Sequence, residues 1–168
     1  PYHKNCPLAL TGKGQFSFLE GIYMQSRDIK DLAAEMQPLA RAFLEQAAKV
    51  LPANVECRII QTGRSAAYQD QLYAQGRTAP GKKVTNATSK NSAHCVDRPE
   101  TETLDSLAFD IGLFRDGKYL DGSKPADVEL YKALGPVGRE LGLRWGGDFK
   151  SITDLPHYEH MSWQNRKR

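Results

Sequence analysis

Residues 145–160 read Trp-Gly-Gly-Asp-Phe-Lys-Ser-Ile-Thr-Asp-Leu-Pro-His-Tyr-Glu-His. This segment combines a glycine turn with several carboxylates and two imidazoles. Such groups are costly to hold together in a fold unless they hydrogen-bond, bind a metal or transfer protons. Asp154 precedes His157 by three residues, which places a carboxylate beside a potential metal ligand. The segment therefore predicts a polar site whose other parts come from elsewhere in the chain.

The composition bounds the class of protein. With 168 residues, 40% of them hydrophobic and 26% charged, the chain can bury one substantial core. We expect a single domain over residues 28–165, after an extended lead-in over residues 1–27 and before a basic tail over residues 166–168. The net charge of +3 favours an anionic partner only weakly, and nothing in the pattern predicts nucleic-acid binding. No apolar run is long enough to predict a membrane span, and three widely spaced cysteines form neither a disulfide framework nor a zinc knuckle.

Hydrophobic periodicity predicts the main elements. Apolar residues at three- and four-residue steps predict a short helix over residues 28–36 and, because Pro38 interrupts the stripe, a second helix over residues 37–50. The same reasoning predicts further helices, and β-branched or apolar runs predict strands. These elements are a strand over 55–62, a helix over 65–74 capped by Ser65, a strand over 107–114 with a hairpin return at 118–120, and a helix over 125–141.

Seven polar residues remain without a packing explanation: Arg64, His94, Asp110, Asp154, His157, Glu159 and His160. Two imidazoles and one carboxylate can form a zinc site that keeps a fourth position open, and a further carboxylate can take a proton from water. Asp110 is notable because a charge inside an apolar strand needs a compensating cation. Glu159 shares a strand face with His157, whereas His160 falls on the opposite face.

Each residue also has a structural interpretation when taken alone. His94 could be a histidine on a surface loop, and His157 could be a core histidine bonded to a backbone carbonyl. Asp110 could be the partner of a buried arginine, because structural ion pairs also bury charges. The joint occurrence of the residues favours a site.

Several motifs follow one another in a recognisable order. They are Thr62-Gly63-Arg64-Ser65, Gln69 with Leu72-Tyr73 and Gly76-Arg77-Thr78, Pro80-Gly81-Lys82 with Val84-Thr85-Asn86-Ala87, Ser92-x-His94, Ala108-x-Asp110, Gly146-Gly147-Asp148-Phe149 and Asp154-x-Pro156-His157-Tyr158-Glu159. Over roughly residues 55–161 the chain resembles the L-alanyl-D-glutamate endopeptidase branch of the D-Ala-D-Ala carboxypeptidase-like zinc peptidases.

The resemblance implies an α+β fold in which a small antiparallel sheet carries a Zn²⁺ site and is flanked by helices. It implies that His94, Asp110 and His157 bind zinc and that Asp154 is the general base that activates water. Arg64 matches the arginine that contacts substrate and steadies the oxyanion. Ser92, Gln69, Glu159 and Tyr158 are expected to support these residues or to contact substrate.

One departure from the family pattern concerns spacing. His94 and Asp110 lie sixteen positions apart here, with a polar stretch around residues 95–105 between them, of which residues 95–103 are expected to be a surface loop. Lengthening a loop costs only about 0.6 kcal/mol per doubling, so both ends can stay in place. Asp97 or Asp105 could replace Asp110 as ligand, but Asp110 is favoured because it alone sits in an apolar strand.

The expected function is zinc-dependent hydrolysis of peptidoglycan stem peptides at the L-Ala-D-Glu bond by a monomer. No apolar signal segment opens the sequence, which is typical of a phage endolysin held in the cytoplasm of the infected host before release to the periplasm or cell wall. A secreted or injected wall hydrolase is the alternative. Competing activities are a D,D-carboxypeptidase or dipeptidase acting on D-Ala-D-Ala, and a non-catalytic, zinc-stabilised wall-binding domain.

Overall fold

The computed structural model describes residues 25–95, 104–150 and 152–163. The expected basic tail, nearly all of the expected lead-in, and Asp97 lie outside these residues. The helices are η1 (Ile29–Asp31), α1 (Met36–Val50), α2 (Ala66–Ala74), η2 (Ser89–Asn91), α3 (Pro125–Ala133), α4 (Gly135–Glu140) and η3 (Gly146–Asp148). The strands are β1 (Val55–Gln61), β2 (Ala108–Arg115), β3 (Lys118–Leu120), β4 (Leu143–Trp145) and β5 (His157–His160).

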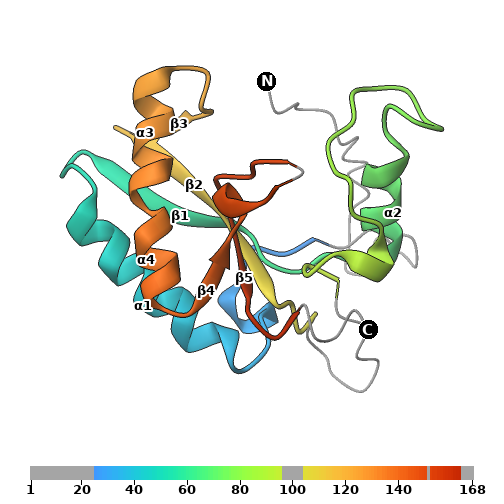
Figure 1. Ribbon diagram of the computed structural model, residues 1–168, viewed down its shortest axis with the longest axis horizontal. Helices are drawn as coiled ribbons and strands as arrows, with labels where there is room; N and C mark the ends of the chain where they lie inside the picture. Colours follow the sequence, from blue (N-terminus) through green and yellow to red (C-terminus); the bar gives the residue numbers. More distant parts are fainter. Residues whose placement is uncertain (1–24, 96–103, 151, 164–168) are drawn as a thin grey trace, which may run out of the picture.

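The strands form one antiparallel sheet in the order β1-β2-β5-β4 (Figure 1). β3 pairs with the second half of β2, opposite residues 113–115, while β5 pairs with its first half, opposite residues 108–110. The expected α+β class with a small antiparallel sheet and flanking helices is therefore confirmed.

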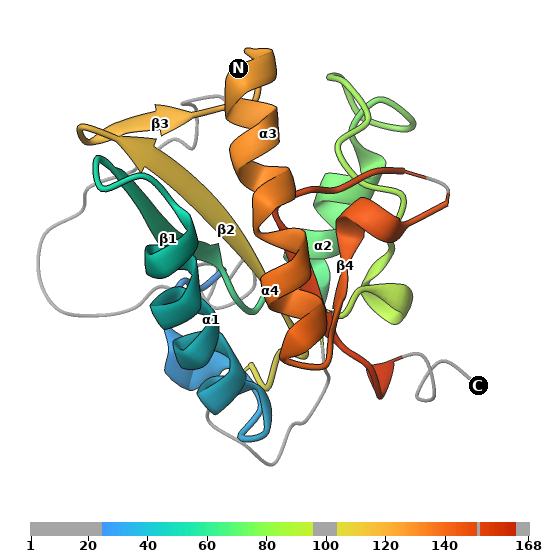
Figure 2. The ribbon, with the colours of Figure 1, turned by 60° about the vertical axis from the view of Figure 1, so that its left-hand side comes forward.

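The hydrophobic core lies on one face of this sheet, under α1 and α4 (Figures 1 and 2). Phe43 of α1 packs 4.4 Å from Tyr158 and 5.5 Å from Phe109, measured between ring centroids. A β-carbon on Gly138 of α4 would lie 2.5 Å from the Tyr158 ring, so glycine lets α4 approach the sheet closely. Because side chains alternate along a strand, the residues next to Phe109 in β2 and next to Tyr158 in β5 point to the other face of the sheet.

Two helix predictions were wrong in extent. Residues 28–36 form only the 3₁₀ turn η1, and α1 then begins at Met36, which places Pro38 within its first turn. The helix expected over residues 125–141 is two helices that meet at Leu134. Pro136 explains the division, because proline has no N–H for a continuing helix and is accepted near the start of a new one.

Other local predictions are confirmed. Ser65 caps α2, since its hydroxyl accepts a hydrogen bond from the amide of Tyr68 at 3.3 Å. The β2–β3 hairpin turns at Asp116 and Gly117, whose φ angles are +50° and +76°. Among the helices of the described residues, none has the length and apolar character that crossing a membrane requires.

Candidate metal centre

Three side chains converge on the sheet face opposite the core. Asp110 of β2 and His157 of β5 are direct partners in the antiparallel register, and His94 arrives from the segment after η2. Asp110 Oδ1 lies 2.9 Å from His157 Nδ1 and 3.2 Å from His94 Nε2, and these two nitrogens are 3.3 Å apart. The long polar insertion therefore does not keep His94 from Asp110.

The insertion is closed at its base by hydrogen bonds. The amide of Leu107 donates to the carbonyl oxygen of Ala93 at 3.0 Å, and the buried Ser106 hydroxyl lies 3.1 Å from Thr62 O. Asp105 is buried, with a φ of +43°. Its side chain is absent from the convergent cluster of His94, Asp110 and His157, so within the described residues it does not replace Asp110.

The outer ring nitrogens of both histidines have acceptors, which fixes where their protons lie. His94 Nδ1 is 2.6 Å from the carbonyl oxygen of Thr62, which can only accept, so Nδ1 carries the proton. His157 Nε2 is 3.1 Å from Glu159 Oε2 and donates to that carboxylate. When both imidazoles are neutral, the inner nitrogens, Nε2 of His94 and Nδ1 of His157, therefore present lone pairs beside Asp110.

Two lone pairs and a carboxylate repel one another unless a cation lies between them. Two imidazole nitrogens and a carboxylate oxygen are a donor set that zinc uses, and outward hydrogen bonds of this kind orient histidine ligands in metal sites. The residues therefore fit a zinc ion.

The pKa values describe the same cluster in its metal-free form. Burial would raise the pKa of Asp110, but the two imidazoles hold it well below its usual value. Burial lowers the pKa of His94. Burial also opposes charging of His157, yet its hydrogen bonds to Asp110 and Glu159 outweigh this and raise its pKa to about 10. A proton on His157 is therefore the cation of the metal-free site at neutral pH.

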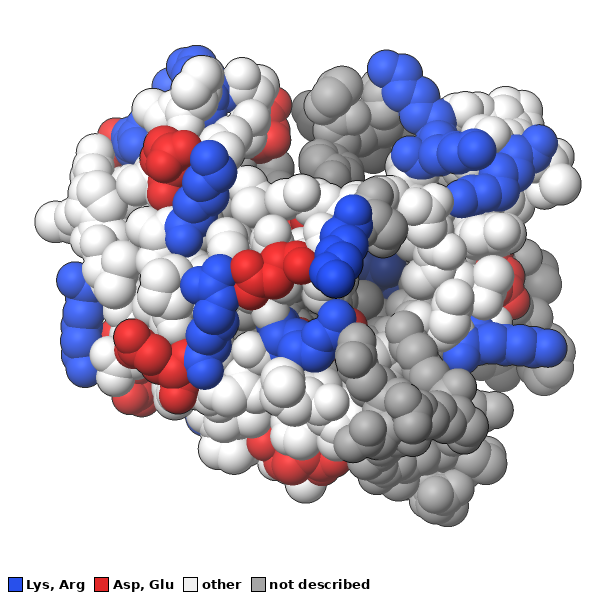
Figure 3. Space-filling model, viewed as in Figure 1, with Lys and Arg blue, Asp and Glu red and all other residues white. Residues whose placement is uncertain are grey.

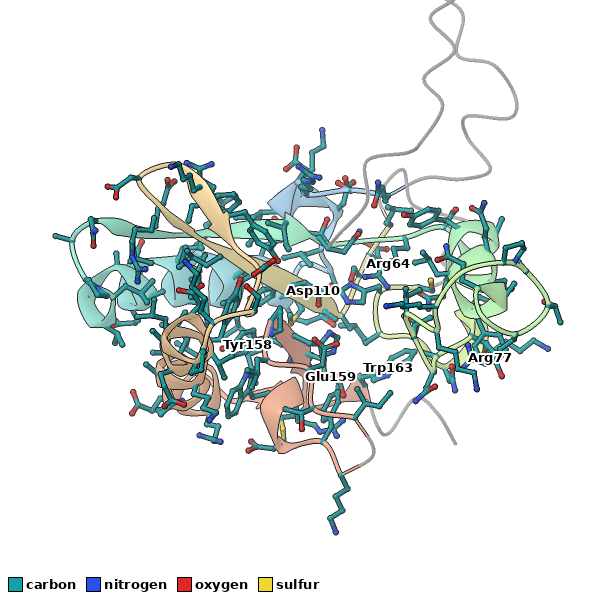
Figure 4. All side chains as sticks on the ribbon, turned by 90° about the horizontal axis from the view of Figure 1, so that it is seen from above. Arg64, Arg77, Asp110, Tyr158, Glu159 and Trp163 are labelled. Atoms are coloured by element: carbon teal, nitrogen blue, oxygen red, sulfur yellow. The ribbon has the colours of Figure 1, made fainter. Side chains whose placement is uncertain are left out.

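Arg64 lies between the sheet and α2, beside Asp110 (Figure 4). Its guanidinium donates to Asp110 Oδ2 at 3.1 Å and to Gln69 Oε1 at 2.9 Å. Gln69 is fully buried and donates in turn to Ala87 O at 2.7 Å, so it holds Arg64 in place. Nε of Arg64 is buried and has no hydrogen-bond partner among the described residues. Ser92 hydrogen-bonds Gln69 at 3.4 Å.

Asp154 stands at the entrance of β5. The residue is exposed, but its carboxyl is partly desolvated by surrounding atoms, and this together with the nearby charge of Asp110 raises its pKa. Its amide donates to Gly146 O at 3.0 Å. A β-carbon on Gly146 would lie 2.3 Å from Asp154 O and 3.0 Å from His157 Cβ, so only glycine permits this close packing.

Two residues of the segment 145–160, Tyr158 and His160, lie outside the His94–Asp110–His157 cluster. Tyr158 was expected to contact substrate or support the ligands, but it is fully buried among Phe43 and Phe109 on the core face. The alternation of side chains along β5, which places it opposite His157 and Glu159, could have predicted this position. His160 hydrogen-bonds Ser162 Oγ at 2.7 Å and is not part of the cluster of His94, Asp110 and His157, as its offset predicted.

Sequence reasoning missed two residues of the site. Arg144 forms an ion pair with Glu159, and Thr62 supplies the carbonyl that orients His94. Neither had a usable signal, because the first depends on the β4–β5 register and the second on a backbone atom.

The fold and the site define a class: an α+β protein whose antiparallel sheet carries a His-Asp-His cluster with a further carboxylate beside it, as in metal-dependent hydrolases. The model of a family described as D-alanyl-D-alanine carboxypeptidase matches residues 104–160. The resemblance to the L-alanyl-D-glutamate endopeptidases is confirmed by two further comparisons.

The peptidoglycan L-alanyl-D-glutamate endopeptidase CwlK of Bacillus subtilis (strain 168) is 29% identical over 154 residues, which cover 86% of each chain. The crystal structure of the Serratia marcescens L-Ala D-Glu endopeptidase ChiX shares the fold. It superposes with a TM-score of 0.54 at 18% identity, covering 90% of this chain and 98% of that one.

Proposed function

We propose that this protein is a zinc-dependent peptidoglycan endopeptidase that cuts the L-Ala-D-Glu bond of stem peptides. The observation that carries the proposal is the convergence of His94 Nε2, Asp110 Oδ1 and His157 Nδ1 beside Asp154. The similarity to CwlK over most of both chains supports the choice of bond.

His94, Asp110 and His157 would hold the zinc ion. A bound zinc ion polarises a carbonyl and lowers the pKa of water. The carboxylate of Asp154 accepts the proton of the attacking water, and its raised pKa makes it a better base for this step than an ordinary aspartate. Arg64 uses one N–H of each terminal guanidinium nitrogen on Gln69 and Asp110, and a second N–H of these nitrogens donates to the substrate and stabilises the oxyanion.

The surface beside the site suits an anionic wall polymer. Lysine and arginine side chains gather over the segment that follows α2, where Lys82, Lys83 and Lys90 are exposed (Figure 3). Positive charge at this position attracts the free carboxylates of stem peptides. We further propose that the protein acts as a monomeric endolysin, held in the host cytoplasm until it is released to the wall, with a secreted or injected hydrolase as the alternative.

A D,D-carboxypeptidase acting on D-Ala-D-Ala is the second candidate, favoured by the description of the family that matches residues 104–160. Digestion of defined muropeptides followed by mass spectrometry separates the two. Fragments ending at L-Ala are expected. Release of terminal D-Ala without L-Ala-D-Glu cleavage would reject the first proposal in favour of the second.

The role of Asp154 is tested by Asp154→Asn, which keeps the shape of the side chain and removes the base. We expect hydrolysis to fall about 10²- to 10⁴-fold while zinc stays bound. Asp148→Asn is the matched control, because Asp148 is an exposed aspartate of the same segment that pairs with Arg139. Wall binding without cutting by the wild type would instead identify a non-catalytic domain.

A further inference from the structure

Arg144 is linked to the proposed histidine ligand His157 through Glu159. Arg144 of β4 lies directly opposite Glu159 of β5 in the antiparallel register and forms an ion pair with Glu159 Oε1. The other carboxylate oxygen, Oε2, lies 3.1 Å from His157 Nε2. Glu159 is only 5% exposed, so its charge depends strongly on protein partners.

Arg144 also contacts Phe149, whose ring lies beside the ring of His157. Its guanidinium carbon lies 4.9 Å from the centroid of the Phe149 ring, and that ring lies 5.6 Å from the ring of His157. The imidazole thus has a carboxylate at its outer nitrogen and an aromatic ring beside it, and Arg144 contacts both.

We propose that Arg144 is a positioning residue for the metal site. This inference rests on the proposed zinc-dependent function. By holding Glu159, Arg144 keeps that carboxylate where it accepts the Nε2 proton of His157, so that Nδ1 faces Asp110 and His94 with its lone pair. Without Arg144 the buried carboxylate loses one of its charged partners and is held less firmly in this position, since breaking a buried ion pair is costly.

A neighbouring arginine provides a matched control. Arg139 and Arg144 both line a surface groove of about 400 Å³. The guanidinium of Arg139 also lies 4.9 Å from an aromatic ring, that of Trp145, and it forms two hydrogen bonds to Asp148. Asp148 pairs with Arg139, whereas Glu159 pairs with both Arg144 and His157. Arg144→Met and Arg139→Met therefore remove the same kind of group, but only the first removes a path to His157.

The test measures zinc affinity by competition with a chromophoric chelator and the His157 Nε2–H proton resonance by NMR. For Arg144→Met we expect zinc affinity to fall about 10- to 100-fold and the hydrogen-bonded Nε2–H signal to be lost. Arg139→Met keeps both at wild-type values. Arg144→Lys, which keeps the charge, recovers part of the affinity and provides a second variant if the methionine variant does not fold.

A double-mutant cycle with Glu159→Gln shows whether Arg144 acts through Glu159. If it does, Arg144→Met costs little further affinity in the Glu159→Gln background. Equal losses in both backgrounds, or an unchanged Nε2–H signal in folded Arg144→Met, overturn the inference. Absence of zinc binding by the wild type overturns the proposed function instead, and the Nε2–H signal then still decides the role of Arg144.

Discussion

Gly146 and Asp154 are in direct backbone contact: the Asp154 amide donates to Gly146 O at 3.0 Å, and a β-carbon on Gly146 would lie 2.3 Å from Asp154 O. The turn that begins at Gly146 therefore determines where the proposed base stands. Backbone atoms cannot move aside as a flexible side-chain end can.

Gly146→Ala is expected to displace Asp154 and to reduce hydrolysis about 100-fold, because misplacing a reacting group by about 1 Å costs that much. The overpacked turn also lowers the free energy of unfolding by about 1–3 kcal/mol. Muropeptide digestion measures the first effect and thermal unfolding the second.

Gly135→Ala separates these two effects. A β-carbon there would lie 2.6 Å from the Trp145 ring, so this variant is also overpacked, but Gly135 does not touch Asp154. It should lose stability and keep most of its activity. Equal activity losses in the two variants would contradict the positioning role of Gly146.

Zinc binding at pH 7 is expected to release close to one proton. Asp110 is already a carboxylate and His94 is already neutral, because the pKa of each is lowered, whereas His157 has a pKa of about 10 and must lose its Nδ1 proton. The apparent zinc affinity should therefore rise about tenfold per pH unit from neutral pH towards the His157 pKa.

Calorimetry in two buffers of different ionisation enthalpy counts this proton. A binding enthalpy that is the same in both buffers, together with an affinity that does not change with pH, would show that His157 is neutral before zinc binds.

Arg64→Lys is expected to lower kcat/KM about 100-fold and to change zinc affinity much less. The guanidinium contacts Asp110 and Gln69 at once through its two terminal nitrogens, whereas an ammonium group cannot reproduce this planar fork. Steady-state kinetics on a defined muropeptide measure the change.

Arg58→Lys serves as the control for Arg64→Lys. Arg58 is an exposed arginine of β1 that pairs with Glu56, away from the metal ligands. Wild-type kinetics for this variant are expected. If Arg58→Lys lowered kcat/KM as much as Arg64→Lys, the loss would not depend on the position of Arg64 beside Asp110.

Local sequence signals predicted the elements whose ends are marked by capping or turn residues. Ser65 marked the start of α2, and Asp116 with Gly117 marked the hairpin. The division between α3 and α4 was missed although the rule applied at Pro38 also applies at Pro136. The helical stripe over residues 125–141 outweighed the proline in that prediction.

For the site, residue chemistry and motif order predicted which side chains gather, and the structure brings His94, Asp110 and His157 together. What the sequence could not supply was the register in which the strands pair. The partnership of Arg144 with Glu159 exists only through the β4–β5 register. The positioning roles of Arg144 and Glu159 are predictions that the variants described above test.

The three ligand side chains also lie far apart along the chain, with separations of 16 positions for His94 and Asp110 and 47 for Asp110 and His157. An ion bound by all three would act as a cross-link that closes two long loops, and such closures restrict the unfolded chain more than the folded one. The stability of this protein would then depend on metal supply, and a chelator would act as a denaturant as well as an inhibitor.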